Sequence, residues 1–377
     1  MRETIVSSFA YGGSGFAAVA ALAKSVFFIL LFIMPLAGIL TWMERRQSAM
    51  MQDRVGPNRA NIGPFTLWGI PHFIADALKM IFKEDFVPPA AEKFLFALAP
   101  VLAVAPVLIA SAIIPFGAPL CWGQMWGHTG PGACVAPVEL QTVHLDAGLL
   151  FYFAIASLAS YGAALAGWAS HNKWALMGGM RASSQMMSYE VTMGMAVMAM
   201  FLVFGTLEPG AMVRAQGDWP WQWGLFRGVP QAIAFFLFLT SAIAESKRTP
   251  FDIPEGESEI VGYFVEYSGM RFGMFYLGEF VEIITSSGLV VTIFFGGWRF
   301  PGAEFLAASV WNWLFVLISI AVWSLKVFLF CAFQLLIRWS LPRFRADQLL
   351  RLGWQRLLPI SIANVVLAAG WILLRGR

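Results

Sequence analysis

The chain has 377 residues, of which 59% are hydrophobic and only 12% are charged, about half the charged fraction of an average soluble domain. Its net charge is +3, and it has no arm rich in lysine and arginine with interleaved aromatic residues. The composition therefore argues against a soluble protein and against a nucleic-acid-binding protein.

Apolar, nearly uncharged segments recur along the whole sequence, each roughly 17 to 25 residues long, which is the length that a helix needs to cross a bilayer. We expect an all-α integral membrane protein that forms a single membrane domain over residues 1–377. Its eight transmembrane helices are predicted at about 25–43, 94–116, 147–168, 190–207, 229–245, 272–296, 305–331 and 357–374.

The first connection contains a helical pattern at about 71–84. Pro71 suits a first helical position, and an apolar stripe follows at the spacing of one helix face, opposed by charged residues. This pattern predicts an amphipathic helix that lies along the membrane surface. The alternative is a helix that packs on a partner protein.

Most lysines and arginines fall in the odd-numbered connections, whereas the even-numbered connections hold only Arg214, Arg227 and Arg299. The positive-inside rule therefore predicts that the odd connections are cytoplasmic. Both termini then face the other side, which is the periplasm if the cell is bacterial and the protein lies in its inner membrane.

The fifth connection holds a dense group of acids, namely Glu245, Asp252, Glu255, Glu257 and Glu259. Apolar residues flank them, which argues against a freely solvated acidic loop. Carboxyl groups that lie close together raise each other's pKa, so these acids could hold or pass protons. For Glu245 the simpler alternative is a local ion pair with Arg248, one helical turn away.

Further acids occur where a membrane helix has little structural use for them. Glu279 and Glu282 share one face of the sixth segment, and Lys326 is a candidate counter-charge. Glu190 is expected at the start of the fourth segment, where the helix dipole or a pairing with Arg181 would stabilise it.

The cysteines and histidines show no spacing that is typical of a metal site, so we predict none. Cys121 and Cys134 share one connection, and the sequence is compatible with either a disulfide or two free thiols there.

Four blocks of sequence go beyond composition. The first block contains Glu44-Arg45-Arg46 and Arg54-Val-Gly56-Pro57-Asn58. The other three blocks begin at Ala169-Ser-His-Asn172, at Ala244-Glu245 and at Leu341-Pro342-Arg343. In this order, over about residues 25–370, they closely resemble the H-subunit family of the proton-pumping NADH:quinone oxidoreductase, respiratory complex I. The mitochondrial counterpart of this family is subunit 1.

The resemblance implies a subunit that anchors the hydrophilic arm of complex I to its membrane arm and forms much of the chamber that admits quinone from the lipid. It implies no flavin, iron–sulfur cluster or nucleotide site in this chain. NAD, flavin and clusters would belong to partner subunits, which are the peripheral-arm subunits of the quinone site and small membrane-arm subunits.

The resemblance also assigns candidate residues. Those expected at the quinone chamber are Glu44, Arg45, Arg54, Asp76, Arg181, Arg248 and Tyr276. Those expected on the path from quinone reduction to proton translocation are Glu190, Glu245, Asp252, Glu255, Glu257, Glu259, Glu266, Glu279 and Glu282.

The chain departs from the family pattern at Phe280, where a tyrosine is common, and its stretch 261–267 is one residue shorter than usual. An alternative is the related membrane subunit of an energy-converting hydrogenase, which need not use quinone. A stand-alone secondary transporter would show an internal inverted repeat, and we find none in the sequence.

Overall fold

The computed structural model describes residues 22–61, 65–121, 137–256, 259–260 and 262–374. Helices dominate this part of the chain, and its two short strands, β1 (Leu120–Cys121) and β2 (Pro137–Val138), pair antiparallel. The predicted all-α fold is confirmed. Cys121 is disulfide-bonded, whereas Cys134 lies outside the described residues.

By length and apolar composition, seven helical segments of the described chain could cross a membrane. They are Leu22–Met51, which includes α3 (Met34–Met51), α5 (Lys93–Ala110) with its continuation to Ile113, the pair α6 (Gly148–Ala156) and α7 (Leu158–Ala169), α8 (Lys173–Phe204), α11 (Gly269–Phe294), α13 (Asn312–Ser340), and α14 (Ala346–Arg351) continued by α15 (Leu358–Leu374). An eighth apolar helix, α10 (Val229–Glu245), has 17 residues.

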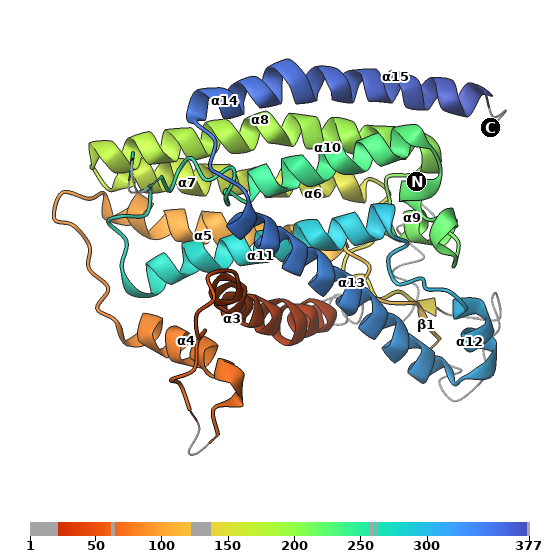
Figure 1. The fold of residues 1–377 in the computed structure, drawn as a ribbon, viewed down its shortest axis with the longest axis horizontal. Helices are drawn as coiled ribbons and strands as arrows, with labels where there is room; N and C mark the ends of the chain where they lie inside the picture. Colours follow the sequence, from red (N-terminus) through yellow and green to blue (C-terminus); the bar gives the residue numbers. More distant parts are fainter. Residues whose placement is uncertain (1–21, 62–64, 122–136, 257–258, 261, 375–377) are drawn as a thin grey trace.

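Three shorter helices lie outside these segments. They are α4 (His72–Phe82), α9 (Pro209–Ala215) and α12 (Ala303–Ser309). In Figure 1, α4 lies at the edge of the bundle, beside α3, and its Met80 approaches Gly273 of α11. No residue of α4 is buried, although Phe73 packs against Gly38 of α3, and Ile74, Leu78 and Ile81 remain exposed. This exposed apolar stripe fits the predicted amphipathic character of the helix.

Helix α8 extends further toward the N-terminus than the predicted segment at 190–207. Helix α8 begins at Lys173, because the Asn172 side chain accepts a hydrogen bond from the Trp174 amide and caps the helix there. Glu190 consequently lies in the middle of α8 rather than at a helix N-terminus, so the dipole explanation for this acid was wrong.

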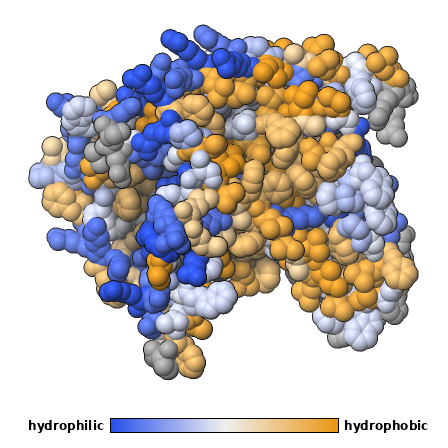
Figure 2. Space-filling view, in the orientation of Figure 1, coloured by the Kyte–Doolittle hydropathy of each residue, from blue (hydrophilic) through white to orange (hydrophobic). Residues whose placement is uncertain are grey.

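Helix α11 is the centre of the bundle. In its most apolar 18-residue window 94% of the residues are buried, against 17–44% in the other candidate spans. In Figure 1 it runs between α5, α10 and α13. Its two acids, Glu279 and Glu282, therefore lie inside protein rather than against lipid. Figure 2 shows that apolar side chains cover much of the visible face, with hydrophilic groups gathered toward the end where α4 lies.

Small residues let the outer helices approach one another closely, as is common in membrane bundles. Helix α7 presents Gly162 to α5, where a Cβ atom would lie 2.6 Å from the Ala103 amide nitrogen and 2.9 Å from its Cα. Gly194 of α8, in contrast, would have no atom within 4 Å of an added Cβ.

We therefore expect Gly162→Ala to separate α7 from α5 and to lower the free energy of unfolding by about 1–3 kcal/mol, as overpacking does. Thermal unfolding of the purified protein in detergent measures this effect. Gly194→Ala is the matched control and should not lower the midpoint. Equal midpoints for the two variants would contradict the close helix contact.

Candidate functional site

Four charged side chains from distant parts of the sequence meet inside the bundle. This buried ion cluster consists of Glu44 of α3, Arg248 after α10, Glu279 of α11 and Arg338 of α13. The Arg248 guanidinium lies 2.9 Å from Glu44 Oε2 and 3.5 Å from Glu279 Oε2, and Arg338 pairs with Glu44 Oε1. The Arg248 side chain is only 5% exposed, so water contributes little to its solvation.

Aromatic rings complete the surroundings of Arg248. Its guanidinium carbon lies 4.0 Å from the centroid of the Phe280 ring and 6.0 Å from that of Tyr276, within the range of cation–π attraction. The ring at position 280 therefore contacts the arginine without the hydroxyl that the family commonly carries.

A buried connection between α10 and α11 brings Arg248 to this place. The Gln185 amide of α8 donates hydrogen bonds to the carbonyls of Ala244 and Phe251, at 2.7 and 2.6 Å. The Phe251 amide in turn donates to the Arg248 carbonyl, and Lys247 adopts a left-handed backbone at φ 55°. The beginning of the connection, at residues 246–251, is thus held by hydrogen bonds inside the protein and is not a solvated loop.

Two acids of this connection lie close to the cluster. Burial, together with the neighbouring Glu279 carboxylate, raises the pKa of Glu255 well above its ordinary value, and Glu255 shares a hydrogen bond with Glu279. Asp252 Oδ2 pairs with Arg343 at 2.7 Å, but burial outweighs this partner and raises the pKa of Asp252. Both carboxyl groups are thereby able to hold a proton at a higher pH than an exposed acid.

Three further acids lie deeper in the bundle. Glu245 is buried and interacts electrostatically with Glu282 of α11 and with Glu190 of α8. Glu282 is 6% exposed, and its Oε1 has no hydrogen-bond partner in the described structure. The structure thus places Glu190, Glu245 and Glu282 near one another, although 92 positions separate the first from the last.

The other candidate residues form separate pairs nearer the surface. Arg45 contacts Asp76 at 2.6 Å, Arg181 contacts Glu259 at 2.9 Å, and the Asn172 amide donates to Glu266 at 2.7 Å. Arg54 bonds to Gln52 and Ser48 of its own segment. Glu257 lies outside the described residues.

Three pairings that the sequence left open as alternatives or candidates are not the ones found in the structure. Arg181 pairs with Glu259 and not with Glu190, and Arg248 pairs with Glu44 and Glu279 rather than with the local Glu245. Lys326 does not neutralise the acids of α11, because its ammonium group donates to the carbonyls of Phe295, Gly297 and Arg299. For the two arginines, a partner brought close by the fold replaces one that is close in sequence.

Three basic residues of the site were missed by sequence reasoning, namely Lys247, Arg338 and Arg343. From the sequence, Arg338 and Arg343 are interpreted as charges of the seventh connection that anchor the protein at the membrane surface. Nothing in the sequence links them to Glu44 or Asp252. Lys247 is buried; burial alone would lower its pKa, but Tyr263 and the carboxylates of Glu282, Glu279 and Glu255 outweigh this effect and raise it. It therefore stays protonated among the acids.

The fold and this site together define a multi-pass helical membrane protein with an internal network of ionisable groups. Residues 23–369 match the family described as NADH dehydrogenase. Among the relatives, H subunit 1 of the NADH-quinone oxidoreductase of Geobacter metallireducens is 43% identical over 350 residues, covering 93% of this chain and 94% of that protein. The H subunit of the NADH-quinone oxidoreductase of Flavobacterium psychrophilum is 38% identical over 354 residues, covering 93% of this chain and 97% of that protein. The chain belongs to the NADH dehydrogenase family, among the H subunits of NADH-quinone oxidoreductase.

The raised pKa of Glu255 leads to a pH-dependent prediction. Its carboxyl group holds a proton more tightly in the folded than in the unfolded state, so the stability it contributes is full below its unfolded pKa and is lost as pH rises through the folded pKa. Glu255→Gln imitates the neutral form. We expect this variant to melt higher than the parent protein at about pH 9 and equally at about pH 4, near the ordinary carboxyl pKa.

Thermal unfolding across this pH range checks the prediction, with Glu304→Gln as the control because Glu304 is an exposed acid of α12. A stability difference that does not change with pH would argue against protonation of Glu255.

Proposed function

We propose that this chain is the membrane subunit of NADH-quinone oxidoreductase that forms the quinone-access chamber and begins the charged path to proton translocation. The observation that carries this proposal is the buried ion cluster with the protonatable Glu255 beside it. Ionisable groups inside a membrane protein are costly and usually serve ion or proton movement. The names of the relatives, which are H subunits of this oxidoreductase, support the same role.

The quinone chamber lies, on this proposal, between the surface helix α4 and the end of α3. The candidate residues there are Glu44, Arg45, Arg54, Asp76, Arg181, Arg248 and Tyr276. The Arg45–Asp76 pair joins α3 to α4, and its side chains are 46% and 24% exposed, so it can open without breaking a buried contact. The exposed apolar stripe of α4 faces outward, where a lipid-soluble quinone would approach.

The coupling path begins where quinone reduction changes charge. Reduction of a quinone to a quinol consumes two electrons and two protons, and a cluster in a partner subunit supplies the electrons. The resulting change of charge acts on Glu255 and Glu279. Because electrostatic interactions are strong in a medium of low dielectric constant, it then acts on Glu282, Glu245 and Glu190. Asp252, Glu257, Glu259 and Glu266 belong to the same acidic region.

The partners follow from this role. The chain binds no redox cofactor of its own, quinone is the substrate, and NAD, flavin and iron–sulfur clusters reside in other subunits of complex I. The charged end of the bundle faces the cytoplasm and the peripheral arm, and both termini face the periplasm of a cell with this complex in its inner membrane. Lipid and small membrane-arm subunits contact the remaining helices.

The membrane subunit of an energy-converting hydrogenase is the rival assignment and is not favoured. The chain retains Gly56-Pro57-Asn58 and the basic connection that contains Arg343, and the relatives carry the quinone oxidoreductase name over 93% of the chain. Purification separates the two, since the proposed complex should contain flavin and iron–sulfur clusters and should reduce quinone with NADH in a reaction blocked by quinone-site inhibitors. Hydrogen evolution without NADH-dependent quinone reduction would refute the proposal.

The first prediction from this function concerns Glu245. Glu245→Gln removes one ionisable group from the buried acids and nearly preserves the shape of the side chain. We expect an assembled complex with NADH–quinone turnover and proton pumping lowered about tenfold or more, which corresponds to at least about 1.4 kcal/mol.

Turnover and pumping in membrane vesicles measure this loss, with assembly checked by flavin content. Glu304→Gln, at the exposed acid of α12, should behave like the parent protein. Normal turnover and pumping in Glu245→Gln would remove this acid from the path.

The second prediction concerns the entrance to the chamber. Asp76→Asn breaks the pair with Arg45, and a partly exposed pair contributes only about 0–1 kcal/mol to stability. We therefore expect an intact complex whose KM for a short-chain quinone rises several-fold. Asp85→Asn is the matched control, since Asp85 pairs with Arg271 at 3.1 Å in a similarly exposed position. An unchanged KM in Asp76→Asn would exclude this pair from the chamber.

A further inference from the structure

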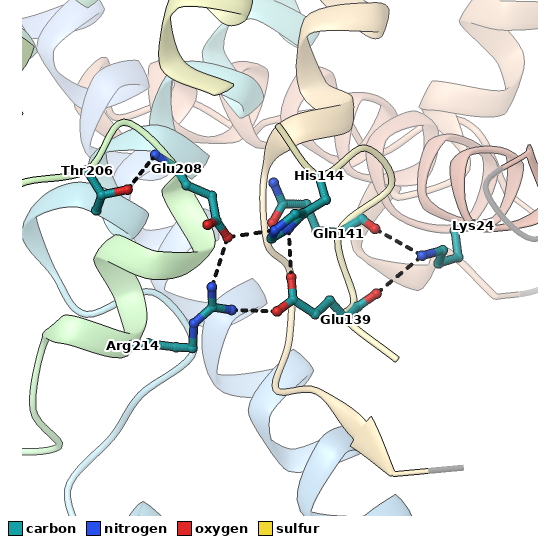
Figure 3. A network of polar contacts seen from close by, with 7 residues as sticks. All are labelled: Lys24, Glu139, Gln141, His144, Thr206, Glu208 and Arg214. Atoms are coloured by element: carbon teal, nitrogen blue, oxygen red, sulfur yellow. Dashed lines mark hydrogen bonds and ion pairs between the residues drawn. The ribbon is translucent and has the colours of Figure 1, made fainter. Parts of the chain in front are cut away.

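A second polar network lies at the other end of the bundle from the buried ion cluster. It is built around three residues that we call the Glu–His–Glu cluster, namely Glu139, His144 and Glu208 (Figure 3). The first two belong to the segment between β2 and α6, and Glu208 immediately precedes α9. None of these residues belongs to the proposed quinone or proton machinery.

The geometry of the cluster is that of ligands converging on one point. His144 Nδ1 lies 2.9 Å from Glu139 Oε2 and 3.3 Å from Glu208 Oε1, and the three ligand atoms all lie within 4.8 Å of one another. Zinc binds imidazole nitrogen and carboxylate oxygen at about 2.0–2.2 Å, so neighbouring ligands of a tetrahedral zinc are about 3.4 Å apart. Only small side-chain movements separate the cluster from that arrangement.

The neighbouring cations position the two carboxylates. Arg214 donates to Glu139 Oε1 at 2.6 Å and to Glu208 Oε1 at 2.9 Å, which leaves Glu139 Oε2 directed at His144. Lys24 donates to the backbone carbonyls of Glu139 and Gln141 and thereby fixes their segment. Carboxylates that bind a metal commonly accept such hydrogen bonds from the residues around them. Arg214 offsets one of the two carboxylate charges, and Lys24 also interacts electrostatically with Glu139.

An independent observation points to a missing ligand at this place. Gln141 is only 3% exposed, yet neither its amide nitrogen nor its amide oxygen has a hydrogen-bond partner in the described structure. A Cβ atom added at Gly210 would lie 3.0 Å from Gln141 Oε1 and 3.1 Å from Glu208 Oε1. The two oxygens therefore border the same space. A bound cation would give Gln141 Oε1 the partner that it lacks.

Space for a small ligand exists beside these groups. A pocket of about 20 Å³ is lined by Glu139, Gln141, Gly210 and Arg214, and one water-sized species needs about 10–15 Å³. The cluster can also be reached from outside, because the side chains of His144 and Glu139 are 35% and 33% exposed.

We propose that Glu139, His144 and Glu208 bind a divalent transition-metal cation, with Zn²⁺ the best match, and that Gln141 Oε1 supplies a fourth ligand. One imidazole and several oxygens suit zinc, whereas calcium and magnesium prefer oxygen ligands alone. Binding through Nδ1 uses the neutral imidazole with its proton on Nε2, so coordination replaces the hydrogen bond to Glu139. The bound metal would tie the segment before α6 to α9.

The test measures zinc in the purified, assembled complex. The complex is treated with EDTA, dialysed against low-micromolar ZnCl₂ and analysed by mass spectrometry, with zinc expressed per flavin. We expect the parent complex to take up one equivalent more than His144→Gln. His171→Asn is the control, since His171 is an exposed histidine whose left-handed backbone asparagine tolerates; it should retain the full uptake.

Two further measurements test zinc binding if the complex with His144→Gln does not assemble. Glu208→Gln preserves volume and the contact with Arg214, and it should weaken zinc uptake at least tenfold. The X-ray absorption difference between the zinc-loaded and EDTA-treated parent complex needs no variant, and it should show nitrogen and oxygen scatterers with an imidazole signature. Equal uptake in parent and Glu208→Gln complexes, or a sulfur-dominated shell, would overturn the proposal.

Discussion

The burial of Arg248 between two carboxylates is the interaction on which the charged end of this protein depends. Moving a charged group out of water costs several kcal/mol, and only close partners of opposite sign offset that cost. Here Glu44 and Glu279 face Arg248, and Arg338 balances the second oxygen of Glu44. Two acids and two bases thereby join α3, α11, α13 and the connection after α10 into one electrostatic unit.

Glu255 adds a carboxyl group to this balanced unit and changes its properties. It lies beside Glu279, which already shares Arg248, so a second negative charge there would have to share Arg248 and Lys247 with the other acids. Burial and the Glu279 carboxylate consequently favour the protonated form of Glu255. A closed ion pair resists such change, whereas a carboxyl group whose pKa is raised by burial and by a neighbouring carboxylate can respond to a change of charge nearby.

The sequence was sufficient to locate most of the long apolar helices and the acidic connection, because both depend on local signals. Long uncharged runs identify membrane helices regardless of what they contact, and apolar residues such as Phe251 and Ile253 marked the connection as buried. The partners of its charges were beyond such reasoning. Glu44 lies 204 positions from Arg248 and 294 from Arg338, and no periodicity links residues at that separation.

The same limit explains the Glu–His–Glu cluster. His144 and Glu139 are five positions apart in an irregular segment, and Glu208 follows 64 positions after His144, so no ligand-spacing motif appears in the sequence. The three side chains come together only when the chain folds and places α9 beside the segment before α6. The unpartnered amide of Gln141 is likewise a property of the folded chain, since a glutamine in a connection would ordinarily be solvated.

Lys247 interacts both with an acid of the connection and with acids of α11. Its ammonium group interacts with Glu282, Glu279 and Glu255, while Glu282 interacts with Glu245. Once it has lost its proton, Glu255 would therefore compete with Glu282 for the positive charge of Lys247. In a poorly screened interior such competition would couple the charge of the connection to that of α11.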